Sequence, residues 1–333
     1  MSKSLSEASK VIEQYCAENP AMPNRTLARK IMFESNIGKS LESIRERVRA
    51  FRGLAGKGSK RTMKRFDYES IKLGIPQSDA QNYVPFKLPD GLKKGLLMSD
   101  THLPYHDIDA LTYALEDGYN EDVDFIILNG DIIDCYQLSS FKKDPLMRSF
   151  KGEIDIAKAF FTMIREMFPK AYILYKFANH EARLNTYLFS HAQSLVGVEE
   201  MTLDKLLDLK SFNIHHVSDK RIIQAGKLSI LHGDEYCGGQ STPIGPARVL
   251  FMKAHDVACC GHWHRTSEYT ERSIMNKTIT CWSIGCLCNM NPDYSPLNNW
   301  NHGYAILHMG QKGAFTIYNK RIGRDHNGIM MRF

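Results

Sequence analysis

Five short fragments of this chain place metal-binding side chains directly after apolar runs. The run from Gly95 to Met98, for example, leads into Ser-Asp-Thr-His, which puts Asp100 and His102 two residues apart. If such runs are buried strands, their carboxyl ends gather at one edge of a sheet, where open α/β sheets keep their ligand sites. We therefore predict that the fragments build a single site. In chain order they supply Asp100 and His102, Asp131 and Asp134, Asn179 and His180, His232, and His262 with His264.

Seven of these side chains provide enough oxygen and nitrogen donors to hold two divalent metal ions. Carboxylates and an amide supply hard oxygens, and imidazoles supply borderline nitrogens. This mixture suits a transition metal better than Ca, and we expect Mn, with Fe, Zn or Ni as alternatives. Two such ions bind one phosphate and hold an attacking hydroxide between them at neutral pH. His180 could donate the proton that the leaving oxygen needs, with Asp134 holding its charged form. The seven donors are Asp100, His102, Asp131, Asn179, His232, His262 and His264.

Strands alternating with helices are predicted from residue 92 onward. Continuous apolar strands separated by helices indicate a parallel sheet covered on both faces, and therefore an α/β fold. Later residues favour a hairpin that turns at 225–227 and two strand-rich segments near the end. The predicted strands are 96–98, 125–128, 171–177, 257–260, 279–284 and 304–318, and the helices are 108–119, 154–168 and 247–255.

Three short helices are predicted at the N-terminus, over 4–18, 25–33 with Asn24 as N-cap, and from Ser40 to Phe51. The third helix carries arginines around its apolar stripe. This arrangement is typical of a helix-turn-helix domain, and a small bundle used for dimerisation or docking is the alternative. We expect domain boundaries of 1–55, a basic linker over 56–90, and a catalytic domain over 91–325. The candidate nucleic-acid contacts are Arg45, Arg47, Arg49 and Arg52.

The net charge of +6 is unevenly distributed along the chain. Residues 1–65 hold 15 Lys and Arg against 6 Asp and Glu, whereas residues 66–333 hold 28 against 31. A basic segment of this kind favours an anionic partner, so we expect DNA or RNA to bind through residues 1–65.

The composition is that of an ordinary globular protein, with 43% hydrophobic and 24% charged residues. No apolar run is long enough to predict a membrane helix, and the first residues lack the order of a secretory signal. Eight scattered cysteines favour reduced thiols, and we interpret Cys286 and Cys288 as packing residues rather than zinc ligands. We expect a cytoplasmic protein without a membrane partner.

The ordered set Asp-x-His, Gly-Asp-x-x-Asp, Asn-His-Glu, His and Gly-His-x-His resembles the calcineurin-like metallophosphoesterases, over residues 92 to 310. The resemblance implies a two-sheet sandwich flanked by helices (αββα) with two metal ions at the sheet edge. It implies that Asp100, His102, Asp131 and His264 bind one ion, and that Asp131, Asn179, His232 and His262 bind the other. His180 matches the family's proton-donating histidine and Asp134 its acidic partner.

Two departures narrow the resemblance. Ala178 stands where the family usually has Gly, and Asp134 is followed by Cys-Tyr instead of the Arg-Gly typical of protein serine/threonine phosphatases. The residues around the motifs resemble those of phage-encoded family members, several of which carry an N-terminal helix-turn-helix. This resemblance implies that the protein is located in the cytoplasm of a bacterial host. Arg183 and Arg265 follow metal motifs directly and could bind a phosphate oxygen.

Three functions remain open. The first is a phosphodiesterase or nuclease acting on nucleic acid, which the basic N-terminal residues favour. The second is a phosphomonoesterase acting on nucleotides or phosphoproteins. The third is a DNA-binding regulatory protein whose metal site is secondary. No Gly-x-x-x-x-Gly-Lys loop is present to support ATP hydrolysis by a P-loop.

Overall fold

The structure is a computed structural model of the 333-residue chain. It describes residues 6–56, 80, 83–144, 146–147, 149–218, 220–236, 245–292, 295–324 and 330–332. The chain divides into two compact units, Met1–Ala80 and Gln81–Phe333, which we call the helical unit and the sheet unit. Residues 57–79 of the linker expected over 56–90 lie outside the described residues.

The helical unit contains three helices, α1 (Glu7–Glu18), α2 (Asn24–Glu34) and α3 (Leu41–Phe51). Their apolar faces meet in one small core that includes Ile12, Leu27, Ile31, Ile44 and Val48. Ser40 caps α3 as predicted, because its hydroxyl accepts a hydrogen bond from the amide of Ser43.

The predicted N-cap of the second helix is wrong. Pro23 occupies the cap position and Asn24 is the first helical residue. The side-chain oxygen of Asn24 accepts a hydrogen bond from Arg52 at 2.7 Å, so it does not serve the first amides of α2. The first helix begins at Glu7, three residues after the predicted start.

The larger sheet of the sheet unit has seven strands in the order β13-β12-β11-β2-β3-β4-β5. Strands β2 to β5 are parallel, and β2 and β3 are buried almost throughout, as their continuous apolar sequences predict. Strands β11 to β13 extend the sheet antiparallel on the side of β2. The strands are β2 (Lys94–Met98), β3 (Phe125–Asn129), β4 (Tyr172–Lys176), β5 (Ile214–Val217), β11 (His302–Met309), β12 (Phe315–Arg324) and β13 (Met330–Arg332).

The smaller sheet has six strands in the order β1-β6-β7-β8-β10-β9. The predicted hairpin is formed by β6 and β7, which pair antiparallel. The edge strand β1 of this sheet, Phe86–Lys87, falls within the range expected as linker and pairs with β6. The strands are β1 (Phe86–Lys87), β6 (Ile223–Ala225), β7 (Leu228–Ile230), β8 (Ala258–Cys260), β9 (Ser267–Arg272) and β10 (Thr278–Ser283).

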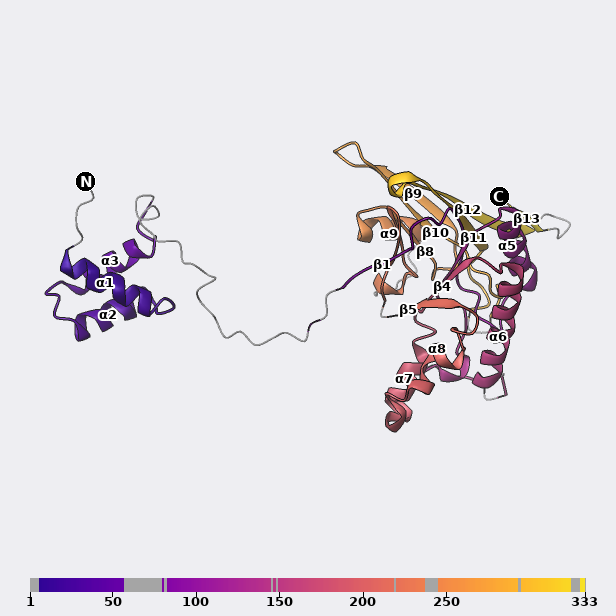
Figure 1. The fold of residues 1–333 in the computed structure, drawn as a ribbon, viewed down its shortest axis with the longest axis horizontal. Coiled ribbons are helices and arrows are strands. Elements are labelled where there is room, and N and C mark those ends of the chain that lie inside the picture. The colour runs from indigo at the N-terminus through magenta and orange to yellow at the C-terminus, as the bar shows by residue number, and fades with distance from the viewer. Residues whose placement is uncertain are drawn as a thin grey trace. The chain divides into compact units, whose positions relative to one another are not determined.

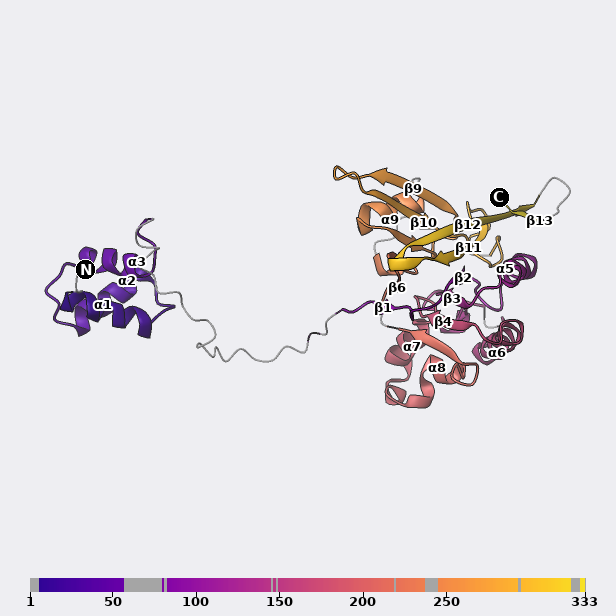
Figure 2. The same cartoon turned by 45° about the horizontal axis from the view of Figure 1, so that its top comes forward.

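Three apolar cores divide the sheet unit into four layers. Alternate residues of β2 and β3, such as Leu96 and Ile126, pack against α5 (Ile108–Asn120) and α6 (Phe150–Met167) on the outer face of the larger sheet. The opposite residues, such as Leu97 and Ile127, face the smaller sheet. The third core lies between that sheet and α9 (Pro246–Ala254). Figures 1 and 2 show α5 and α6 side by side, with α9 beyond the second sheet. The predicted αββα sandwich is confirmed.

Several element bounds differ from the predictions. Helix α6 begins at Phe150, about a turn earlier than expected, because Ser149 caps it by accepting from the amide of Gly152. Two further helices after β4, α7 (Arg183–His191) and α8 (Leu203–Leu206), were not predicted. In the described part of the chain, no helix combines the length and the apolar character that crossing a membrane requires.

Candidate metal centre

The site lies on loops that leave the carboxyl ends of the strands in left-handed backbone conformations. Asp100, His102, Asp131, His262 and His264 all have φ between 47° and 66°. This conformation costs an L-residue of the order of 1–2 kcal/mol, and such strain collects where function requires it. Five of the seven predicted donors are therefore held in an uncommon backbone geometry.

Gly130 explains why these loops can approach so closely. Its φ is 85°, and a Cβ atom there would lie 2.5 Å from the Cβ of Ala178 and 2.6 Å from Nδ1 of His232. The loop that carries Asp131 thus packs directly on the loops that carry two other predicted donors.

Asp100, His102 and His264 form a first cluster. Nε2 of His264 lies 3.2 Å from Oδ1 of Asp100 and 3.2 Å from Nε2 of His102. Oδ1 of Asp100 is also 4.0 Å from Nε2 of His102. All three side chains are buried, so their donor atoms converge on one point away from bulk water.

Asp131, His232 and His262 form a second cluster. Nε2 of His232 lies 3.2 Å from Oδ2 of Asp131 and 3.2 Å from Nδ1 of His262. Donor atoms of Asp131, His102 and His180 also lie within 4.8 Å of one another. Asp131 therefore stands between the two clusters, where one carboxylate can contact two ions.

The donor set fits divalent metal ions. Oδ1 of Asp100 and Oδ1 of Asn179 are buried and accept no hydrogen bond from any residue that the structure describes. Two pairs of imidazole nitrogens also face each other at 3.2 Å. Buried oxygens without donors are costly, and a cation satisfies both them and the lone pairs of the imidazoles.

Outer hydrogen bonds fix the imidazole nitrogens that face the clusters. Nδ1 of His232 lies 2.8 Å from the carbonyl oxygen of Asn129, and Nδ1 of His102 lies 2.8 Å from Oδ1 of Asp134. Because an Nδ1–H donates in each case, Nε2 is left as the acceptor that a metal requires. Asp134 thus orients His102 as well as its predicted partner His180.

Glu181 stabilises the loops of the site, although we predicted no role for it from the sequence. Its carboxylate accepts hydrogen bonds from the amides of Asp131, Ile132 and Ala178, and from the hydroxyl of Tyr175 at 2.6 Å. Glu181 therefore joins the loop after β3 to the loop after β4. Its position in the Asn-His-Glu fragment is the one feature of the sequence that could have indicated this role.

The buried ion pair between Lys176 and Glu235, 2.8 Å apart, also stabilises the site. The Glu235 carboxylate also accepts from the amides of His232 and Gly233, at 3.1 and 2.7 Å. It therefore fixes the backbone that presents His232. The partners are 59 residues apart, and the pattern of the sequence carries no signal for their pairing.

His180 lies beside the shared aspartate. Its Nδ1 is 3.0 Å from Oδ1 of Asp134, and its Nε2 is 3.7 Å from Oδ2 of Asp131. Arg183 donates to the carbonyl oxygen of Asp134 at 2.7 Å, and its Nη2 lies 3.0 Å from Nε2 of His180. Since guanidinium only donates, Nε2 of His180 accepts in this conformation.

The two arginine candidates differ in position. Arg183 lines a cavity next to His180. Arg265 is half-buried and is not among the described residues that line that cavity. Arg183 is thus the better placed of the two to contact a phosphate.

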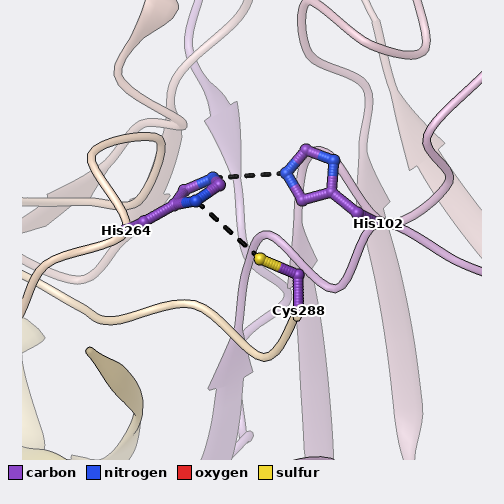
Figure 3. A group of neighbouring side chains, drawn as sticks. All are labelled: His102, His264 and Cys288. Carbon is purple, nitrogen blue, oxygen red and sulfur yellow. Dashed lines mark hydrogen bonds between the residues drawn. The ribbon is translucent and has the colours of Figure 1, made fainter. Parts of the chain in front are cut away.

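Cys288 touches the first cluster, whereas the sequence favoured a packing role. Its Sγ lies 3.8 Å from Nδ1 of His264, and Figure 3 shows the thiol directed toward this nitrogen, while the other ring nitrogen of His264 faces His102. Cys288 therefore contacts the nitrogen of His264 that does not face Asp100, and the thiol helps to orient the imidazole.

The charges of the site favour cation binding. Burial alone would raise the pKa of Asp100 and of Asp131, but the facing imidazoles hold both pKa values below their usual range. Burial opposes the charged form of His264, yet Asp100 raises its pKa to about 9. Protons and metal ions thus compete for the same nitrogens, so metal affinity falls as the pH is lowered.

The segment that follows Asp134 rests on a buried carboxyl group. Glu153 on α6 is fully buried, its Oε1 accepts from the amide of Tyr136 at 3.1 Å, and its Oε2 accepts from no described donor. Burial, together with the charge of Asp134, raises the pKa of Glu153 to about 8. The neutral form therefore predominates in the folded protein at pH 7.

We expect Glu153→Gln to stabilise the sheet unit at alkaline pH. A raised carboxyl pKa contributes stability that is full below the unfolded value of about 4.5 and is lost as the pH rises through about 8. The amide keeps the acceptor for Tyr136 without this loss, so the variant should be more stable at pH 8.5 by about 2–4 kcal/mol.

Urea unfolding at pH 5 and pH 8.5, followed by tryptophan fluorescence, checks this expectation. All three tryptophans lie in the sheet unit, so the signal reports that unit alone. Glu116→Gln, at an exposed position of α5, is the control and should change neither curve. Equal stability of the Glu153→Gln variant and the parent at pH 8.5 would contradict the buried neutral carboxyl.

The chain was compared with known proteins, first with solved structures. Among solved structures, Vps29 from Chaetomium thermophilum is similar at 12% identity and a TM-score of 0.37, over 73% of this chain and 94% of its own. Yfce, a phosphoesterase from E. coli, is similar at 13% identity and a TM-score of 0.32, over 68% and 98%. A dimetal phosphatase from Danio rerio is similar at 12% identity and a TM-score of 0.31, over 70% and 96%. No curated protein sequence matches the chain.

The family model for calcineurin-like phosphoesterases matches residues 94–266. This range covers more than half of the chain and includes both clusters, His180 and the strands that lead to them. Members of this family depend on two metal ions, and the groups assembled here can hold them. The chain belongs to the calcineurin-like phosphoesterase family and is a metal-dependent hydrolase of phosphate esters.

Proposed function

We propose that this protein is a phosphodiesterase that hydrolyses nucleic acid. The observation that carries the chemistry is the pair of donor clusters joined by Asp131, with His180 beside them. The observation that favours nucleic acid is the basic excess of residues 1–65, with 15 Lys and Arg against 6 Asp and Glu.

In the proposed mechanism, the donors of the two clusters would hold divalent ions, which would polarise the phosphate and lower the pKa of a water molecule. The water oxygen loses one proton to bulk solvent and bonds to phosphorus, and the bond from phosphorus to the leaving oxygen breaks. Nε2 of His180 gives its proton to the leaving oxygen, while Asp134 holds the opposite nitrogen of the ring.

Arg183 must release His180 before that proton can be delivered. Its guanidinium occupies Nε2 in this conformation, at 3.0 Å. An incoming phosphate oxygen is a stronger acceptor than a neutral imidazole, so substrate binding draws Arg183 away and leaves Nε2 to be protonated. In this proposal Arg183 binds substrate and also controls when His180 becomes an acid.

Several arginines of the helical unit already have partners within that unit, so fewer of them are available for nucleic acid than the sequence suggests. The Arg52 guanidinium donates to the carbonyl oxygens of Met22 and Asn19 and to the side chain of Asn24, so it holds the unit together. Arg45 and Arg49 pair with Glu42 and Glu46 of the same helix.

Arg47 is exposed, and one of its nitrogens donates to Ser9. The described residues 6–56 hold nine Lys and Arg against six Asp and Glu, while residues 57–65 hold five Lys and Arg and no acid. The proposal for nucleic acid therefore rests on Arg45, Arg47 and Arg49 together with the cations that follow the helices.

A phosphomonoesterase acting on a small substrate is the second candidate. Residues 81–333 hold 27 Lys and Arg against 28 Asp and Glu, so the sheet unit has no basic excess to attract a polyanion. A small phosphate monoester does not need one.

The two candidates separate in one comparison. The full chain and a chain that begins at Gln81 would be assayed on 4-nitrophenyl phosphate, bis(4-nitrophenyl) phosphate, and single- and double-stranded DNA. We expect both proteins to prefer the diester and only the full chain to cut DNA efficiently. Between 50 and 200 mM salt its DNA cleavage should fall by roughly 10²-fold if four phosphates are contacted.

Arg45→Ala/Arg47→Ala/Arg49→Ala in the full chain should weaken that salt dependence. Lys151→Ala/Lys205→Ala, at two exposed positions of the sheet unit, is the matched control. A clear preference for the monoester, together with no binding or cleavage of DNA at about 50 mM salt, would favour the second candidate.

A further inference from the structure

A cavity of about 840 Å³ lies beside the metal-facing side chains. His102, Asp134, His180 and Arg183 form part of its wall. The rest of the wall includes residues from 136–147, between β3 and α6, and from 288–292, after β10, which the hydrolytic chemistry does not use. A phosphate held at the two clusters therefore places one of its substituents in this cavity.

Aromatic and apolar side chains supply much of the cavity surface. The rings of Tyr105 and Tyr136 lie edge to face, with centroids 6.0 Å apart. Phe141 borders the same cavity and leaves 77% of its surface exposed, and Met147 is another apolar residue of the lining. Exposed aromatic side chains next to a reaction centre are typical of surfaces that bind flat rings.

Polar groups in the same lining can read the edge of a ring. Asn289 and Asn291 carry amides, which both donate and accept hydrogen bonds, and Ser139 carries a hydroxyl. Lys142 adds a positive charge in the segment that carries Phe141. Flat apolar faces, amide groups and a cation together match a nucleobase attached to a phosphodiester.

We propose that this cavity is a subsite for one unpaired nucleobase of the phosphodiester that the metal centre hydrolyses. The subsite rests on the phosphodiesterase function proposed above. A base that is paired and stacked within a duplex cannot enter a concave pocket, so the subsite selects single-stranded substrate or an unpaired end. The cavity volume lies within the range of pockets that enclose a small ligand.

The test compares two diesters that share a leaving group. Thymidine 5′-(4-nitrophenyl phosphate) and methyl 4-nitrophenyl phosphate differ in the nucleoside, and each would be assayed with the metal ion that gives the highest activity. We expect kcat/KM to favour the nucleoside ester by roughly 5- to 150-fold, the value of one base stacked on an aromatic ring. Equal kcat/KM for the two esters would overturn the subsite and leave the phosphodiesterase intact.

Variants of the lining locate the effect. Phe141→Ala and Tyr136→Ala should each reduce that preference by at least about fivefold. Tyr136→Phe keeps the ring but loses the hydroxyl that accepts from the amide of Asp144, so it should retain most of the preference. Phe189→Ala removes an exposed aromatic side chain of α7 and is the control, with no change expected. A preference that survives both alanine variants would overturn the assignment.

Binding without turnover keeps the test independent of activity. The full chain should bind thymidine 5′-phosphate at least about fivefold more tightly than 2-deoxyribose 5-phosphate in calorimetry, and Phe141→Ala should remove the difference. If neither ester is hydrolysed, the phosphodiesterase fails and this binding ratio alone decides the subsite. Equal cleavage of single-stranded and duplex DNA would refute the requirement for an unpaired base.

Discussion

Asp131→Asn should abolish phosphoesterase activity and lower the bound metal from two ions per chain to one or fewer. The loss should exceed the roughly 10–100-fold that removing an outer hydrogen-bond partner costs, because one carboxylate faces both clusters. A neutral amide removes charge from both ion sites at once.

Asparagine is well suited to isolate that charge. Asp131 has φ of 51°, a left-handed conformation that asparagine tolerates better than most residues. Its Oδ1 accepts from the amide of His180 at 3.0 Å, and an asparagine oxygen can accept the same bond. The loop should therefore keep its shape while its affinity for metal changes.

Elemental analysis after dialysis, alongside diesterase assays, checks this expectation. Asp117→Asn is the matched control, because Asp117 is also a buried aspartate of the sheet unit but bonds to the hydroxyl of Tyr304, outside both clusters. It should retain metal and activity. Two ions per chain in the Asp131→Asn protein, with activity within tenfold of the parent, would refute the shared carboxylate.

The strands and the loops that follow them could be predicted because their signals are local. Leu96 to Met98 and Phe125 to Leu128 are apolar without interruption, which indicates burial on both faces, and β2 and β3 are buried in that way. Each run stops at a polar fragment, so the edge of the sheet where the donors meet followed from the order of the motifs alone.

The interactions that stabilise the site could not be predicted, because the residues that form them are distant in the sequence and are of common types. Lys176 and Glu235 form an ion pair only after β4 and the loop after β7 come together. Glu153 and Cys288 are likewise ordinary residues until the fold places them beside Tyr136 and His264. A single buried partner leaves no periodic pattern along the chain.

The backbone of the donor loops was also hidden from the sequence. His102, Asp131 and His264 have left-handed φ values. A histidine or an aspartate in a sequence does not predict this conformation as glycine does. For Asn24, in contrast, the residue type suggested a role that the structure does not show. Its type is typical of an N-cap, but a long-range hydrogen bond from Arg52 determines where its side chain lies.

His180→Asn should reduce kcat by about 10²–10⁴-fold for substrates with a poor leaving group while both metal ions remain bound. His180 makes its contacts with Asp131, Asp134 and Arg183 from the edge of the second cluster. An alkoxide cannot leave without a proton, whereas 4-nitrophenolate can. The loss should therefore shrink to about tenfold or less for 4-nitrophenyl esters.

The size of the leaving-group effect separates proton donation from a merely structural role. Asp134→Asn provides the comparison, because Asp134 contacts Nδ1 of both His102 and His180 and should lower metal content as well as kcat. His191→Asn, on the exposed end of α7, is the control and should match the parent. If His180→Asn slows good and poor leaving groups equally, His180 holds the site in place and the acid must be sought elsewhere.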